Sequence, residues 1–76
     1  MTYEDIQKFV ISNNDDYVCV TYTSIAKKYY GRLIRVYCSG DDMNCYLVVE
    51  DNEKFDMHFD SIYITNIELV DFDLGI

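Results

Sequence analysis

The residues most able to do chemistry together lie in one short stretch, where a histidine is flanked by two aspartates. His58 stands between Asp56 and Asp60, and in an extended strand these alternate residues share one face, about 6.5–7 Å apart. Imidazole and carboxylate groups are metal-ligand types, but zinc sites use three or four convergent ligands and the chain has a single histidine. We interpret this stretch as an exposed polar strand face and expect no metal and no other cofactor.

The chain offers few of the groups that catalysis needs. A single histidine limits general acid–base pairs and histidine-activated nucleophiles. The sequence contains neither a glycine-rich phosphate loop nor a nucleophile-elbow motif. A Cys–His pair could form only through contacts made by the fold, and no local pattern supports one. We therefore expect a protein that is not an enzyme and has no catalytic residues.

A basic, tyrosine-rich segment offers a binding surface instead. Residues 17–40 contain four basic residues and no acid, and cations alternate with tyrosines over residues 27–37. Proteins that hold single strands or nucleotides combine cations with aromatic platforms in this way, although tyrosines in strands are also common core and interface residues. The alternative function that we keep open is nucleotide binding by Lys27, Lys28, Tyr30 and Arg32.

Acidic residues dominate the rest of the chain. The formal net charge is −8, and residues 41–76 carry ten acids against the single base Lys54. This charge opposes binding to a long nucleic acid, whose affinity comes mostly from phosphate neutralisation. The acids either form a solubilising surface or meet an arginine-rich partner, with bidentate pairs fixing the geometry. The candidate contacts are Asp41, Asp42, Glu50, Asp51, Glu53, Asp56 and Asp60, with Tyr46 and Tyr63 as aromatic anchors.

The cysteines and the N-terminus bear on the cellular compartment. Cys19, Cys38 and Cys45 form no CxxC pair, and an odd number leaves at least one thiol unpaired. The N-terminus has acids where a secretory signal has basic residues, and no apolar run approaches the ~18 residues of a membrane span. We predict free cysteines that behave as small buried hydrophobes, no membrane partner and a cytoplasmic location. One disulfide is the other interpretation.

The elements that position these residues form one predicted domain, residues 1–76. Thr2 and Asp5 make a near capping box, and apolar residues recur at helical spacing over residues 3–11. This predicts a short amphipathic helix, with residues 1–14 comprising the helix and its cap.

Residues 17–70 alternate between β-forming runs and turn residues, which predicts five strands followed by a tail at residues 71–76. Gly31 predicts a bend or bulge, and a phase slip at Thr65 and Asn66 predicts another bulge. The fold class is α+β, mainly β: a short N-terminal helix followed by a five-stranded, strongly bent antiparallel sheet or small barrel. The predicted strands cover residues 17–23, 29–38, 44–50, 55–60 and 62–69. The predicted core contains Ile6, Phe9, Val18, Val20, Ile34, Val36, Leu47, Val49, Phe55, Met57 and Phe59.

Residues 31–51 are similar to part of a known family. Gly31-Arg32-Leu33 followed by the run MNCYLVVED at residues 43–51 resembles the first motif of the Sm family, G-x-L … M-N-x-x-L-x-x-x-D. A helix followed by five strands is also the element order of Sm-like and related SH3-like barrels. The resemblance implies a small barrel in which Asn44 hydrogen-bonds an RNA base, which adds Asn44 to the alternative nucleotide-binding site.

Very small acidic proteins without catalytic residues resemble, in size and charge, phage-encoded inhibitors of bacterial defence, the anti-CRISPR type. The resemblance implies a nucleic-acid mimic that acts in the host-cell cytoplasm. Our leading interpretation is a non-enzymatic acidic binding protein that occupies a cationic nucleic-acid-binding surface of a bacterial defence protein such as a CRISPR nuclease. The alternative is an Sm-like module that binds RNA or a small nucleotide through residues 27–37. A homodimer stays open, because exposed sheet edges invite pairing.

Overall fold

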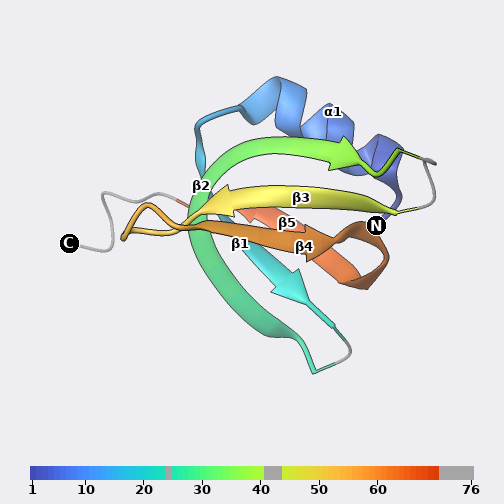
Figure 1. The fold of residues 1–76 in the computed structure, drawn as a ribbon. Helices are drawn as coiled ribbons and strands as arrows, with labels where there is room; N and C mark the ends of the chain where they lie inside the picture. The colour runs from blue at the N-terminus through green and yellow to red at the C-terminus, as the bar shows by residue number, and fades with distance from the viewer. Residues whose placement is uncertain (24, 41–43, 71–76) are drawn as a thin grey trace.

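The computed structural model describes residues 1–23, 25–40 and 44–70, and it shows one helix followed by a five-stranded sheet (Figure 1). The predicted fold class is therefore confirmed. The elements are α1 (Tyr3–Asn13), β1 (Tyr17–Tyr22), β2 (Lys27–Cys38), β3 (Cys45–Glu50), β4 (Asp56–Asp60), the 3-10 helix η1 (Ser61–Tyr63) and β5 (Ile64–Leu69). No helix in this part of the chain is long and apolar enough to cross a membrane.

The five strands form one antiparallel sheet in the order β4-β3-β2-β1-β5. Strand β2 pairs with β1 over its first half and with β3 over its second half. It bends strongly along its length, so that the β3–β4 side of the sheet turns over the β1–β5 side (Figure 1). Apolar side chains from both sides consequently enclose a single core. The two edges of the sheet are β4 and β5, which η1 connects.

Helix α1 begins where the sequence predicts. The Thr2 hydroxyl oxygen accepts a hydrogen bond from the Asp5 N–H at 3.2 Å, which satisfies one of the free N–H groups of the first turn. Ile6 and Val10 lie one turn apart on the buried face of the helix, which packs mainly on β2. The Asn14 side chain then donates to the Ile34 carbonyl at 2.6 Å and ties the end of the helix to β2.

Most of the predicted core is correct, and two errors have clear causes. Phe55 is 65% exposed, because β4 begins only at Asp56 and leaves Phe55 in the preceding turn. Ile34 is only half-buried, whereas the neighbouring Leu33 is fully buried. The core cluster contains Ile6, Val10, Val18, Val20, Leu33, Leu47, Val49, Phe59, Ile64 and Ile67, and the predicted residues Phe9, Val36 and Met57 pack against it.

Register shifts between paired strands explain where the alternation of buried and exposed side chains changes phase. Between β1 and β5, Thr21 pairs with Asn66 but Tyr22 pairs with Ile64, so the bulge predicted at residues 65–66 is confirmed. The bulge predicted at Gly31 lies instead between Leu33 and Arg35, which is why Leu33 and not Ile34 points into the core.

Gly31 allows a close approach. A Cβ at this position would lie 2.6 Å from the Val49 side chain and would press against the Glu50 carbonyl oxygen. Glycine is the only residue without a Cβ, and the close spacing between β2 and β3 leaves no room for one here.

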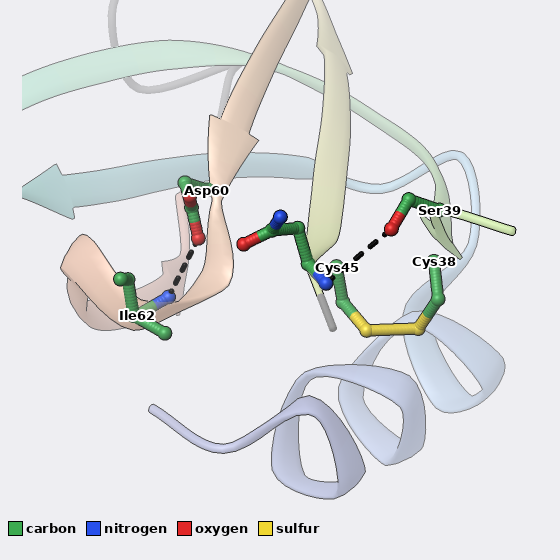
Figure 2. Close-up of a disulfide and its surroundings, with 6 residues drawn as sticks. Cys38, Ser39, Cys45, Asp60 and Ile62 are labelled. Carbon is green, nitrogen blue, oxygen red and sulfur yellow. Dashed lines mark hydrogen bonds between the residues drawn. A yellow bond between two sulfur atoms is a disulfide. The ribbon is translucent and has the colours of Figure 1, made fainter. Parts of the chain in front are cut away.

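A disulfide joins Cys38 and Cys45 at the β2–β3 hairpin, so the prediction of free cysteines is wrong for these two (Figure 2). The strand register places them directly opposite each other, and the Ser39 N–H donates to the Asn44 carbonyl at 2.7 Å within the same hairpin. Cys19 is free and buried, as predicted. The cysteine pattern therefore no longer supports a reducing compartment.

Candidate functional site

The turn between β3 and β4 brings together four of the predicted acidic contact residues. Glu50 at the end of β3 pairs across the ladder with Asp56 at the start of β4, and Asp51 and Glu53 lie between them. We call residues 50–56 the acidic hairpin. Asp41 and Asp42, also predicted contacts, lie outside the described residues.

Hydrogen bonds fix the shape of the acidic hairpin. One Asp51 carboxylate oxygen accepts from the N–H groups of Glu53 and Phe55, each at 2.9 Å. The Asp51 N–H donates to the Phe55 carbonyl at 3.0 Å, and the Lys54 N–H donates to the Asp51 carbonyl at 3.0 Å. Lys54 itself has a positive φ of 67°, a conformation that the turn imposes. The hairpin is therefore a preformed element, in which Asp51 acts as a structural residue as well as a charge.

Phe55 is the residue of this hairpin that sequence reasoning missed. Its side chain is 65% exposed, and its neighbours in the chain are Lys54, which follows Glu53, and Asp56. Phe55 is one of several large apolar side chains that are exposed, and it is the one that lies on the acidic hairpin, where a partner surface could bury it. The sequence hinted at this exposure only through the position of Phe55, directly after the turn residues 51–54. The alternation of apolar and polar residues cannot show whether such a residue ends the turn or begins the strand.

Arg32 connects the acidic hairpin to the end of α1. Its guanidinium contacts Glu50 at 2.8 Å and Asp15 at 3.5 Å, and the hydrogen bond that it donates to the Glu50 carboxylate raises the pKa of Arg32. Arg32 is thus occupied by carboxylates and is a poor candidate for the phosphate contact that the alternative function assigned to it. Among the described residues, two bases and six acids give this end of the molecule a net charge of −4: Arg32, Lys54, Asp15, Asp16, Glu50, Asp51, Glu53 and Asp56.

The remaining predicted partner contacts lie elsewhere. Asp60 ends β4 at the opposite end from the acidic hairpin, where its carboxylate accepts from the Ile62 N–H at 3.2 Å and caps η1 (Figure 2). Tyr63 is exposed on η1, with its ring 6.1 Å from that of Tyr22. Tyr46 lies on the outer face of β3 against Tyr37. The structure does not gather these three residues with the acidic hairpin.

The residues of the alternative nucleotide site do not converge either. Lys27 and Lys28 begin β2, and the Lys27 ammonium lies 5.5 Å from the centre of the Tyr29 ring. Asn44 stands beside the other end of β2, whose 12 residues span on the order of 35 Å when extended. Tyr30 lies between, exposed on the outer face, where a hydrogen bond with the Cys19 thiol raises its pKa.

The side chain nearest to His58 in hydrogen-bonding terms is a tyrosine, and not the aspartates Asp56 and Asp60 that were considered with it as metal ligands. Its Nδ1 atom lies 3.1 Å from the Tyr37 hydroxyl, within hydrogen-bond distance. Across residues 1–23, 25–40 and 44–70, no three histidine, cysteine or acidic side chains converge as a ligand set.

The structure thus defines a small, bent-sheet domain of the α+β class with an acidic hairpin at one end. Comparison with protein families, curated proteins and solved structures finds no match for this chain.

Proposed function

We propose that this chain is a non-enzymatic binding protein that docks its acidic hairpin on a cationic surface of a nucleic-acid-handling protein and thereby competes with the nucleic acid. The observation that carries the proposal is the 65% exposure of Phe55 on a hydrogen-bonded turn between Glu53 and Asp56. An exposed aromatic with charged neighbours in the chain has the composition of an interface anchor and its polar rim.

The two kinds of residue would make different contributions to the complex. Carboxylates steer the encounter with a basic surface and pair with arginines in fixed geometry. A buried phenylalanine anchor supplies the affinity that exposed charge pairs do not, because water and salt weaken the latter. Since the turn is already held by Asp51, little conformational entropy is lost when it binds.

Surfaces that bind a nucleic-acid backbone concentrate the lysines and arginines that such a hairpin needs. The similarity of this chain in size and charge to phage-encoded inhibitors makes a bacterial defence nuclease, such as a CRISPR nuclease, the partner class that we propose. The Cys38–Cys45 disulfide lies at the opposite end of β3 from the acidic hairpin and takes no direct part in the proposed contact.

Capture from a bacterial lysate, followed by titration against the purified partner, tests this function. We expect Phe55→Ala to weaken binding by about 30-fold or more, the range of an anchor residue, while leaving the free energy of unfolding within about 0.5 kcal/mol. A Glu53→Lys/Asp56→Lys variant should slow association and remove its dependence on salt. The matched control is Glu4→Lys/Asp5→Lys, which reverses two exposed acids on α1.

The control variant should bind within about twofold of wild type, because α1 lies outside the proposed contact, and added oligonucleotide should displace the protein from its partner. A partner whose contact surface is neutral or acidic would refute the mechanism. So would an affinity that both hairpin variants leave unchanged.

A further inference from the structure

The outer face of the sheet carries a second cluster, far along β2 from the lysines considered above. It consists of Arg35 and Tyr37 on β2, Tyr46 on β3 and His58 on β4, which we call the outer aromatic cluster. The strand register assembles it: Tyr37 lies opposite Tyr46, while Arg35 and His58 flank Val48 from either side.

The rings of this cluster contact one another in a defined arrangement. Tyr37 and Tyr46 have centroids 5.4 Å apart and an interplanar angle of 33°. His58 meets Tyr37 edge to face at 5.9 Å and is held by the 3.1 Å hydrogen bond to its hydroxyl. The Arg35 guanidinium lies 5.9 Å from the centre of the Tyr37 ring. Each ring is therefore positioned by at least one neighbour from another strand.

Val48 shows that this layer is packed. It is 0% exposed, although it points to the outer face and does not belong to the core cluster. Its cross-strand neighbours on that face are Arg35 and His58. The cluster is thus a preformed surface whose construction does not depend on a ligand.

The charge of Arg35 indicates what this surface recognises. Both salt bridges among residues 1–23, 25–40 and 44–70 belong to Arg32, so Arg35 has no carboxylate partner there, in a chain with 14 acids. Tyr37 beside it remains 37% exposed. A guanidinium without a carboxylate next to a tilted pair of tyrosine rings presents the two groups that hold a nucleotide: an aromatic surface for the base and a donor fork for the phosphate.

We propose that the outer aromatic cluster binds a nucleoside phosphate, whose base stacks on the tilted ring pair of Tyr37 and Tyr46 and whose phosphate is bound by Arg35. His58, whose Nδ1 atom lies 3.1 Å from the Tyr37 hydroxyl, is exposed and offers a further polar group beside the rings. A ligand with one or two phosphates tolerates the net charge of −8 far better than a long strand does. This site is separate from the acidic hairpin and does not rest on the function proposed for it.

Calorimetric titration of the intact protein with AMP, GMP, CMP and UMP tests the site, with amide NMR shifts to locate it. Adenosine lacks the phosphate and ribose 5-phosphate lacks the base, and we expect each to bind at least about fivefold more weakly than AMP. A phosphorylated dinucleotide distinguishes the end of a strand from a free nucleotide, since only a strand-binding site should prefer it. Either preference supports the site.

Variants on one strand face separate this site from general charge effects. We expect Arg35→Gln and Tyr46→Ala each to weaken AMP binding by about tenfold, and Tyr37→Phe, which keeps the ring, to retain it. Lys28→Gln and Tyr30→Ala change the same outer face of β2 outside the cluster and should leave affinity unchanged. The proposal is overturned if ~10 mM AMP produces neither heat of binding nor amide NMR shifts. It is also overturned if the cluster variants and the control variants lose AMP affinity equally. Retained folding of each variant is checked by circular dichroism, and Arg35→Gln provides the test of lost affinity if Tyr46→Ala unfolds.

Discussion

Opening the Cys38–Cys45 disulfide should destabilise the domain by an amount that its loop length sets. The two cysteines are separated by 7 positions in the sequence. The loop-closure relation gives an entropy of about 8 cal/mol/K for so short a loop, or roughly 2.4 kcal/mol at 25 °C. Because a domain of this size has only about 3–5 kcal/mol of stability from its core, the loss is a large share of the total.

Urea unfolding of the oxidised protein, followed by circular dichroism, measures this loss against the protein reduced with a phosphine. With a urea dependence of about 1 kcal/mol/M, the lower value for small proteins, the midpoint should fall by about 2 M on reduction. A Cys38→Ala/Cys45→Ala variant should resemble the reduced protein and should not respond to the phosphine.

Mass spectrometry of the alkylated protein determines whether the bond was present and then opened. A midpoint within about 0.3 M of the oxidised value, in protein shown to have two newly freed thiols, would refute the loop-entropy reasoning. Three free thiols in protein purified without reductant would refute the pairing itself.

Three further outcomes follow from the packing and from one titrating group. Gly31→Ala should cost about 1–3 kcal/mol in urea unfolding because its Cβ would overlap Val49 and the Glu50 carbonyl, whereas the matched Gly40→Ala meets nothing within 4 Å and should change stability by less than about 0.5 kcal/mol. Phe59→Ala should cost about 3–5 kcal/mol and leave much of the protein unfolded by circular dichroism, because Phe59 is 4% exposed in the core. The hydrogen bond with Cys19 raises the pKa of Tyr30 above its ordinary value of 10.0, so the folded protein keeps the Tyr30 proton to a higher pH than the unfolded chain does. This hydrogen bond therefore contributes fully to stability below pH 10.0, and the contribution is lost as the pH rises through the pKa of Tyr30 in the folded state. The fall in urea midpoint between about pH 9.5 and 11 should therefore be shallower in Tyr30→Phe, and an identical fall in both proteins would contradict this assignment.

Features set by neighbouring residues could be predicted from the sequence. The Thr2 cap, the helical spacing of Ile6 and Val10, and the phase slip at Thr65 each depend on residues within a few positions of one another, and the structure contains all three. Alternation along each run likewise placed Val18, Val20, Leu47, Val49 and Phe59 in the core. Local hydrogen bonding and the two-residue period of a strand are sufficient for such predictions.

Features set by strand register and by the bend of the sheet could not be predicted. The Cys38–Cys45 pairing and the burial of Leu33 depend on how β2 aligns with β3, and a shift of one residue reverses which side chains face the core. Asn44 and Lys27 lie beside opposite ends of the 12-residue strand β2, and the close approach of β3 to Gly31 also follows from the pairing of these two strands. The sequence by itself determined the composition of the elements, their order and most of the core. Only the tertiary structure decided which side chains meet on each surface, because those contacts join residues distant in the chain.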